Sequence, residues 1–89
     1  MSRTITLSPR GEGDLRRVPD RQRLAILEGL HALADEHPTA EIRALADHRG
    51  WYRLRVGDWQ VLYLSDPPGV MIDRVVNRRD LERALATLP

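Results

Sequence analysis

The sequence predicts an α+β fold, because its hydrophobic period changes from helical spacing to strand spacing partway along the chain. In the first half, residues 14–18 and 21–36 carry apolar residues at helical spacing. From Trp51 onward, three runs alternate between apolar and polar residues and are separated by turn sequences. Helices followed by consecutive antiparallel strands in one short chain are typical of α+β domains.

Length and composition indicate one domain over residues 1–89, since 42% of the residues are apolar and 30% are charged. No apolar run approaches the ~18 residues of a membrane span, and the N-terminus lacks the apolar core of a signal peptide. We therefore expect a cytoplasmic protein without membrane contact. The chain has no cysteine, and His31, His37 and His48 lack the spacing of a zinc site. We expect no metal and no cofactor.

The N-terminal part begins with a predicted strand over residues 4–8, in which Ile5 and Leu7 alternate with polar residues and would face the core. A short helix over residues 14–18 follows, and Pro19 ends it because proline cannot continue a helix.

The longest predicted helix covers residues 21–36, with Asp20 as its N-cap and the His37-Pro38 pair as its end. Its apolar stripe consists of Leu24, Ile26, Leu27, Leu30, Leu33 and Ala34. We expect the two helices to form a hairpin that packs on the sheet.

The second half is predicted to contain three consecutive antiparallel strands. Residues 39–50 form a connector before them, from which Ile42 and Leu45 reach the core. The predicted strands cover residues 51–56, 59–64 and 70–76. Gly57-Asp58 is a two-residue hairpin turn, with glycine at the first central position of a type II′ turn, and residues 66–69 form the second turn.

The hairpin turn sets which side chains share a face. On one face the cross-strand pairs are Val56 with Trp59, Leu54 with Val61, and Tyr52 with Tyr63. If the helices cover that face, Arg53, Arg55 and Gln60 project together from the other. Alternate residues of a strand lie roughly 6–7 Å apart, close to the spacing of successive phosphates on single-stranded nucleic acid. All fourteen basic residues are arginine, whose planar guanidinium suits phosphates.

A last helix is predicted after Asn77, which caps it, with Asp80 at the third helical position as in a capping box. Arg78 and Arg79 add positive charge beside the helix N-terminus. The residues that dock this helix on the core are Leu81, Ala84, Leu85 and Leu88.

Each of these features also has a purely structural interpretation. Alternating arginines on a sheet are often only a solvated face, and Asn77 and Asp80 are explained by capping alone. Trp51 and Trp59 suit packing as well as base stacking.

The segment 52–63, YRLRVGDWQVLY, resembles the hairpin signature of RelE/ParE toxins, and residues 73–81 are similar to the C-terminal motif of that family. Residues 7–9 and 14–18 resemble its opening strand and helical hairpin. The resemblance implies a RelE-like fold, with an N-terminal strand and helical hairpin packed on an antiparallel sheet and a C-terminal helix. It also implies the toxin of a bacterial type II toxin–antitoxin pair. RelE-like members cleave mRNA in the ribosomal A site, whereas ParE-like members poison DNA gyrase.

The resemblance also assigns roles to individual residues. Arg53 and Arg55 match the basic residues that hold substrate phosphates, and Arg78 matches a phosphate-stabilising arginine. Gln60 stands where many members have an arginine that contacts the scissile phosphate. Asn77 occupies a position often filled by histidine or lysine. The tyrosine that RelE-like nucleases place a few residues later is absent, and residues 81–83 are Leu-Glu-Arg.

RNA cleavage by the 2′-hydroxyl needs a proton acceptor, stabilisation of the charged phosphorane and a proton for the leaving oxygen. Arginine supplies the stabilisation but accepts protons poorly. Glu82 is the proton acceptor expected in the last helix, and His48 is an alternative from the connector.

The leading hypothesis is a ribosome-dependent mRNA endoribonuclease that inhibits translation and arrests growth. Its expected catalytic residues are Arg53, Arg55, Arg78 and Glu82, and Gln60 and Arg79 join the three arginines in RNA and phosphate binding. The alternatives are a ParE-like gyrase inhibitor and a non-catalytic member that only binds its antitoxin. The expected partners are the ribosome, mRNA (or DNA gyrase) and a partly acidic antitoxin, with which the protein would form a heterotetramer.

Overall fold

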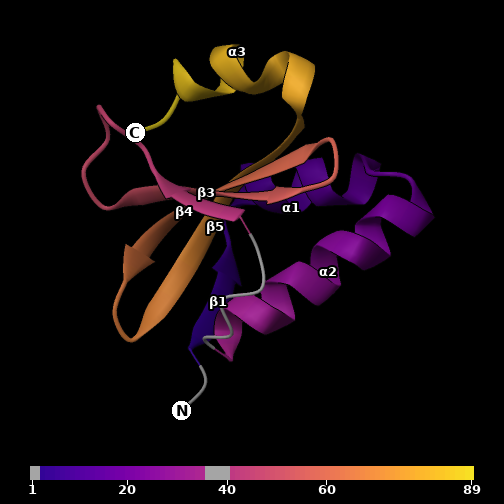
Figure 1. Ribbon diagram of the computed structural model, residues 1–89, viewed down its shortest axis with the longest axis horizontal. Helices are drawn as coiled ribbons and strands as arrows, with labels where there is room; N and C mark the ends of the chain where they lie inside the picture. The colour runs from indigo at the N-terminus through magenta and orange to yellow at the C-terminus, as the bar shows by residue number, and fades with distance from the viewer. Residues whose placement is uncertain (1–2, 36–40) are drawn as a thin grey trace.

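The computed structural model describes residues 3–35 and 41–89, which form a five-stranded sheet with helices on both faces (Figure 1). In chain order the elements are β1 (Thr4–Leu7), α1 (Pro9–Arg17), α2 (Asp20–Ala34), β2 (Glu41–Ala44), β3 (Trp51–Val56), β4 (Trp59–Asp66), β5 (Gly69–Asn77), the 3₁₀ helix η1 (Arg78–Asp80) and α3 (Leu81–Leu85). The strand order in the sheet is β1-β5-β4-β3-β2. None of the helices formed by the described residues has the length and apolar character needed to cross a membrane.

The predicted three-stranded meander is confirmed. Strands β3, β4 and β5 pair antiparallel in succession, and Leu54 lies opposite Val61 while Arg55 lies opposite Gln60. Gly57 has a φ of 60°, in the left-handed region that favours glycine, so glycine suits the tight turn between β3 and β4. The predicted register of the hairpin is therefore the observed one.

The N-terminal strand joins the sheet in a way that the sequence did not predict. Strand β1 pairs parallel with β5, so the sheet is mixed and not purely antiparallel. Ile5 packs against the core as expected, but Leu7 is 37% exposed and the prediction that it faces inward is wrong. Strand β1 is an edge strand with β5 as its neighbour on one side, so the side chain at its end has little to pack against.

The predicted connector over residues 39–50 contains a strand. Residues 41–44 form β2, which pairs antiparallel with β3 and is exposed along its whole length. Ile42 is 37% exposed and does not reach the core, and Leu45 is half-buried. As the outermost strand, β2 has only β3 as a neighbour, so its apolar side chain has little to pack against.

The helical hairpin is confirmed, with shifted ends. Helix α1 begins at Pro9, five residues before the predicted start, because the Ser8 hydroxyl accepts a hydrogen bond from the Gly11 N–H at 3.1 Å. Helix α2 begins at Asp20, so Pro19 and not Asp20 occupies the cap position. It ends at Ala34, and the predicted stop at His37-Pro38 lies outside the described residues.

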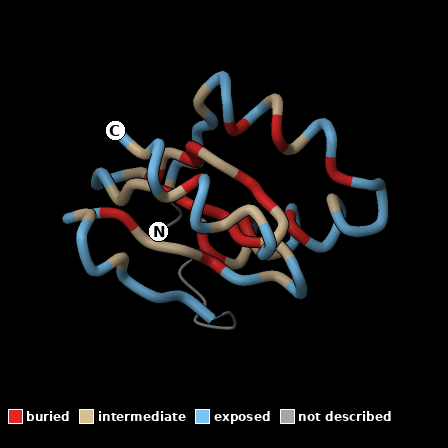
Figure 2. Tube along the Cα trace, turned by 90° about the horizontal axis from the view of Figure 1, so that it is seen from above, coloured by how far each residue is buried: buried red, intermediate tan, exposed pale blue. Residues whose placement is uncertain are grey.

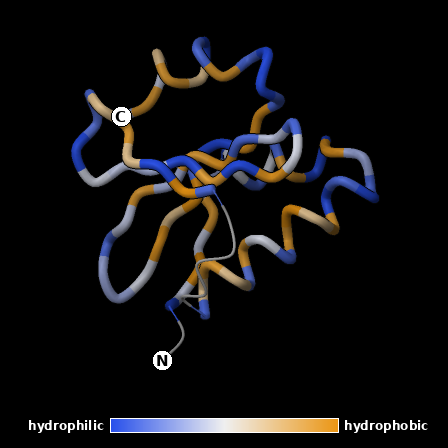
Figure 3. Tube along the Cα trace, in the orientation of Figure 1, coloured by the Kyte–Doolittle hydropathy of each residue, from blue (hydrophilic) through white to orange (hydrophobic). Residues whose placement is uncertain are grey.

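Two apolar clusters hold the layers together, and the buried segments gather in the sheet (Figure 2). The main cluster joins the sheet to the helical hairpin through Val18, Ile26, Leu30, Leu33, Leu54, Val61, Tyr63, Val70, Ile72 and Val75. On the opposite face Leu62 and Val76 pack under Ala84 of α3, with Leu81, Leu85 and Leu88 around them as predicted. Of the predicted α2 stripe, Leu24 and Leu27 are 59% and 37% exposed and lie outside the core, so the prediction is wrong for these two residues. The inner strands β4 and β5 contain runs of consecutive apolar residues because the helices cover both faces of the sheet there (Figure 3).

Helix α1 lies along the edge of β5 beyond the end of β1. There the Ser8 N–H donates to the Ile72 carbonyl at 2.9 Å, and the Asp14 carboxylate accepts the Val75 N–H at 3.0 Å. Asp14 is 9% exposed and also accepts from Arg74 Nε at 2.7 Å. A side-chain acceptor thus replaces the missing neighbouring strand, and the buried backbone N–H is satisfied.

Tyr63 lies on the helix-covered face of the sheet, 3% exposed and stacked on Tyr52 with a ring-centroid distance of 5.6 Å. Burial raises the pKa of its phenol above the ordinary value of 10.0, and nearby Arg3 opposes this increase in part. The Tyr63 hydroxyl therefore stays protonated at neutral pH and belongs to the core.

We expect Gly11→Ala to destabilise the protein by about 1–3 kcal/mol. The added Cβ would lie 2.5 Å from the Ile72 carbonyl oxygen, which is backbone and cannot move aside cheaply. Gly13→Ala in the same helix is the matched control, because its Cβ would meet only the Arg17 guanidinium at 3.7 Å. It should stabilise the protein by about 0.5–1 kcal/mol. Urea unfolding of both variants tests this, and equal effects would contradict the close approach of α1 to β5.

Asp14→Ala should lower the free energy of unfolding by about 2–4 kcal/mol, since it leaves the Val75 N–H and the Arg74 guanidinium without their acceptor. Glu12→Ala removes a carboxylate from the same helix, where an exposed pair with Arg16 contributes less than about 1 kcal/mol. Denaturant midpoints of the two variants provide the comparison. A loss for Asp14→Ala no larger than that for Glu12→Ala would show that Asp14 does not hold the edge of β5.

Candidate functional site

A polar pocket of about 220 Å³ opens on the α3 face of the sheet, over strands β2, β3 and β4. Its lining, which we name the strand pocket, consists of Glu41, Arg43, Arg53, Arg55 and Gln60. With three arginines against one glutamate, the pocket carries a positive charge suited to an anion.

The register of the sheet builds this pocket from two rows of side chains. One row runs Glu41, Arg55, Gln60 and Val76 across four strands, and the next runs Arg43, Arg53, Leu62 and Arg74. Helix α3 covers the rows where they are apolar, at Leu62 and Val76. The polar ends over β2 and β3 stay open, and the strand pocket lies there.

The arginines of the strand pocket differ in their partners. Arg55 Nη2 donates to Glu41 Oε1 at 2.6 Å, and both side chains are more than half exposed. Within the part of the chain that the structure describes, neither Arg43 nor Arg53 has an acceptor for its guanidinium. Two guanidinium groups are therefore available to an incoming phosphate, whose oxygens they would bind as charge-assisted acceptors.

Gln60 forms the buried part of the strand pocket, with only 4% of its surface exposed. Its Oε1 atom is buried and has no hydrogen-bond partner among the described residues. A buried acceptor without a hydrogen bond typically destabilises a fold by about 1–3 kcal/mol. It is unusual to find one in a pocket whose arginines offer donors. The prediction that Gln60 projects from the same face as Arg53 and Arg55 is confirmed, although Gln60 is far more buried than an open face would leave it.

The other predicted site residues do not line the strand pocket. Arg78 is 75% exposed and lies at the β3–β4 turn, where its N–H donates to the Asp58 carbonyl at 2.7 Å and its Nε lies 3.9 Å from Asp58 Oδ1. Glu82 lines a separate hollow of about 420 Å³ between α3 and the segment that links β2 to β3, and His48 lines the same hollow. The catalytic roles of Arg78 and Glu82 stay predictions, and the structure places both outside the arginine cluster.

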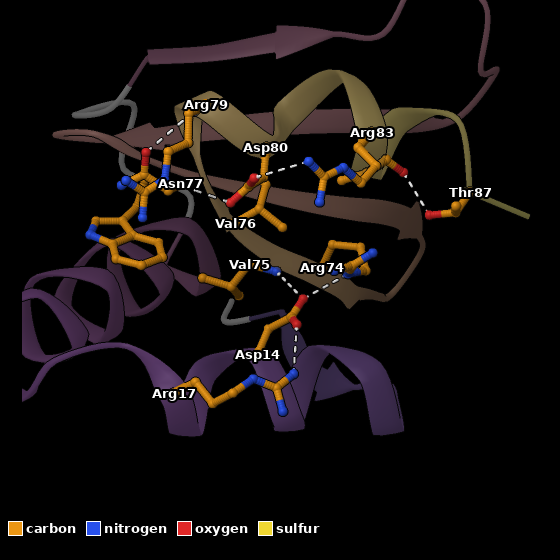
Figure 4. A pocket seen from close by; sticks show the side chains of 12 residues that line it. Asp14, Arg17, Arg74, Val75, Val76, Asn77, Arg79, Asp80, Arg83 and Thr87 are labelled. Atoms are coloured by element: carbon orange, nitrogen blue, oxygen red, sulfur yellow. Dashed lines mark hydrogen bonds and ion pairs between the residues drawn. The ribbon is translucent and has the colours of Figure 1, made fainter.

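Arg79 lines a second cationic hollow, of about 390 Å³, between α1, β5 and the C-terminal helices (Figure 4). Four arginines surround it: Arg17, Arg74, Arg79 and Arg83. Arg17 and Arg74 are held by Asp14, whereas Arg79 and Arg83 stay more than four-fifths exposed and approach Asp80 only to 4.0 and 3.9 Å. Asp14 and Asp80, which line the same hollow, thus neutralise part of its positive charge.

The capping residues behave partly as predicted. Asn77 Oδ1 accepts the Arg79 N–H at 3.3 Å, so Asn77 caps the C-terminal helices. Asp80 faces Arg79 and Arg83, and not the Asn77 backbone as a capping box would require. Trp51 is 7% exposed and packs in the protein. Trp59 packs against the core but is only half-buried, and it also lines the second cationic hollow.

Arg43 and Glu41 are the pocket residues that the sequence interpretation missed, because residues 39–50 were predicted as an irregular connector. The alternation in Glu41-Ile42-Arg43-Ala44 is a strand signal, although four residues are too few to stand out. With β2 beside β3, the two arginines expected from the hairpin gain a third one from a neighbouring strand.

The strand pocket can bind a phosphate and stabilise negative charge on it. Among the described residues that line it, Glu41 is the group able to accept a proton. No cluster of three or more histidine, aspartate or glutamate side chains suited to a metal ion occurs within residues 3–35 and 41–89.

No family model matches this chain, and no curated protein matches its sequence. Solved structures do match its fold. The RelB–RelE antitoxin–toxin complex of Methanococcus jannaschii has a TM-score of 0.77 at 18% identity, over 89% of this chain and 96% of that one. The toxin–antitoxin complex RelBE2 of Mycobacterium tuberculosis has a TM-score of 0.76 at 26% identity, over 88% of this chain and 100% of that one. The DinJ–YafQ toxin–antitoxin complex of E. coli has a TM-score of 0.75 at 16% identity, over 91% and 98%. The chain therefore has the α+β fold of the RelE, YafQ and YoeB toxins of type II toxin–antitoxin systems, as its sequence motifs indicate.

Proposed function

We propose that this protein is the toxin of a type II toxin–antitoxin pair and that it cleaves mRNA on the ribosome. The observation that carries the proposal is the strand pocket, in which Arg43 and Arg53 have no acceptor within the described residues and Gln60 lies beneath them. Support also comes from the fold, since the structures that match it include toxins in complex with their antitoxins. Such a toxin would act in the cytoplasm, where it meets translated messages.

The proposed reaction is attack of a ribose 2′-hydroxyl on the adjacent phosphate. The O2′–P bond forms, the P–O5′ bond breaks, and the products are a 2′,3′-cyclic phosphate and a 5′-hydroxyl end. The guanidinium groups of Arg43 and Arg53 would stabilise the additional negative charge of the phosphorane, which is typically the largest contribution to such catalysis. Arginine remains charged at any working pH and so does this without losing a proton.

Proton transfer needs other groups. The 2′-hydroxyl proton requires an acceptor, and Glu41 is the carboxylate that lines the strand pocket. It would have to exchange its ion pair with Arg55 for the substrate, which costs little because both side chains are exposed. The proton for the leaving 5′ oxygen would come from water or from ribosomal RNA. Dependence on the ribosome agrees with a pocket that lacks a complete set of acid and base groups.

The nuclease proposal is tested by adding the purified protein to cell-free translation and mapping the ends of the message. We expect cuts in phase with codons only when ribosomes translate the message. Arg43→Ala combined with Arg53→Ala should lower the cleavage rate at least about 100-fold, because the phosphorane loses both donors. Arg21→Ala together with Arg49→Ala removes the same charge outside the strand pocket and should change the rate little.

Intact messages under growth arrest would contradict this proposal. Double-strand DNA breaks under the same arrest would point to gyrase inhibition. A protein that causes neither effect but binds its partner would be a non-catalytic member.

The antitoxin is expected to be a small, partly acidic protein that folds on this chain. Its carboxylates would pair with Arg43 and Arg53, and its apolar side chains would cover Leu24 and Leu27, which are 59% and 37% exposed on α2. Co-expression with the adjacent open reading frame should give a stable complex, such as the heterotetramer predicted from the sequence. Arg43→Glu with Arg53→Glu should weaken the complex at least about tenfold in a titration, because like charges then face each other. If the product of the adjacent open reading frame does not bind this protein, the predicted antitoxin partner is wrong.

A further inference from the structure

Gln60 supplies the strand pocket with a hydrogen-bond acceptor, whereas the pocket's arginines supply only donors. Its Oε1 is buried and without a partner in the described part of the chain, although Arg55 lies directly across from it on β3. Arg55 Nη2 is directed away from Gln60, to Glu41 on the neighbouring strand. Gln60 thus lines the pocket with an acceptor that has no partner, beside the two arginines that lack acceptors of their own.

An apolar residue would suit this position if packing were its only role. On the same face, Gln60 has Leu62 two residues along its own strand and Val76 across from it on β5, and both are buried under α3. A methionine of similar length could fill this place without leaving a polar atom unsatisfied. The glutamine thus retains an acceptor that the protein itself does not use.

The ligand that satisfies Gln60 must carry a hydrogen-bond donor next to an anion. A phosphodiester carries no proton at neutral pH and its oxygens only accept hydrogen bonds, so a phosphate bound by Arg43 and Arg53 cannot serve Gln60 as well. The amino groups of the bases are donors in RNA and DNA alike but lie farther from the phosphate than the sugar does, and the DNA sugar has no donor within a strand. The ribose of RNA has a 2′-hydroxyl close to its phosphate, and this hydroxyl is the group by which proteins distinguish RNA from DNA.

We infer that Gln60 Oε1 accepts a hydrogen bond from a ribose 2′-hydroxyl of an RNA strand whose phosphate lies against Arg43 and Arg53. Glu41 and Gln60 lie on either side of β3, so the hydroxyl that Gln60 binds belongs to a neighbouring ribose and not to the one whose proton Glu41 accepts. Gln60 is thus a specificity-determining residue that selects ribose over deoxyribose. The inference rests on the proposed function, because it assumes that the strand pocket holds RNA.

Binding of a short single-stranded RNA to the whole protein without ribosomes tests the inference, with fluorescence anisotropy as the readout. The comparison probe is the same sequence with 2′-fluoro sugars, which retains the bases and the sugar pucker but has no hydroxyl donor. We expect the wild type to bind RNA about five- to tenfold more tightly than the 2′-fluoro strand. Gln60→Met should bind both strands equally, at about the wild-type affinity for the 2′-fluoro strand. Gln22→Met, on the exposed surface of α2, is the matched control and should keep the preference.

Thermal unfolding supplies a second readout that does not depend on RNA. If Oε1 has no partner in the free protein, Gln60→Met should melt at the same temperature as the wild type or higher. A large decrease would mean that Gln60 bonds within the protein, and it would overturn the inference.

The outcomes also separate this inference from the proposed function. Equal wild-type affinity for the two strands overturns the role of Gln60, while ribosome-dependent cleavage that needs Arg43 and Arg53 would leave the nuclease proposal in place. A preference for RNA that persists in Gln60→Met assigns the discrimination to another residue and also overturns the inference. Absence of binding to either strand, or binding unaffected by Arg43→Ala with Arg53→Ala, removes RNA from the strand pocket altogether.

Discussion

The Asp14 carboxylate makes the interaction on which the arrangement of the layers depends. Strand β1 pairs with β5 only as far as Ile72, so the edge of β5 beyond that residue would present backbone groups with no strand beside them. Asp14 accepts the Val75 N–H and the Arg74 guanidinium there, and Gly11 allows α1 to approach the Ile72 carbonyl. Helix α1 is thereby fixed beside β5, and the helical hairpin that follows is held over one face of the sheet. Without this contact the core face would lack a defined cover.

The position of the helical hairpin on one face of the sheet determines which side chains are exposed on the other face. Leu54 and Val61 are buried under α2, so their neighbours along each strand, Arg53 and Arg55 on β3 and Gln60 and Leu62 on β4, must point to the opposite face. There α3 covers only Leu62 and Val76. The remaining positions over β2 and β3 are polar and form the strand pocket. Helix α3 packs on the apolar part of these two rows of side chains and leaves their cationic part, the strand pocket, uncovered. The buried Gln60 lies at the boundary between them, which explains why it combines deep burial with access to the pocket.

Much of the hairpin could be predicted from local sequence because its determinants are local. A two-residue turn with glycine at Gly57 admits one register, and that register assigns Arg53, Arg55 and Gln60 to a single face. The cap at Asn77 and the spacing of the last apolar residues were likewise local signals. Helix ends were less predictable, since α1 begins at a Ser8-Pro9 pair that suits a turn equally well, and residues 9–13 include two glycines.

The sequence by itself determined the α+β class, the three-stranded meander and the face that carries the arginines, because period and turn chemistry act over a few residues. Only the tertiary structure decided that β1 pairs parallel with β5, that β2 brings Glu41 and Arg43 beside Arg53, and that Arg78 and Glu82 lie outside the pocket. These facts depend on pairing between segments far apart in the chain, and no local pattern specifies which strand edge a short polar segment will join. The arginine-bearing hairpin was therefore visible in the sequence, whereas the pocket that it forms with β2 was not.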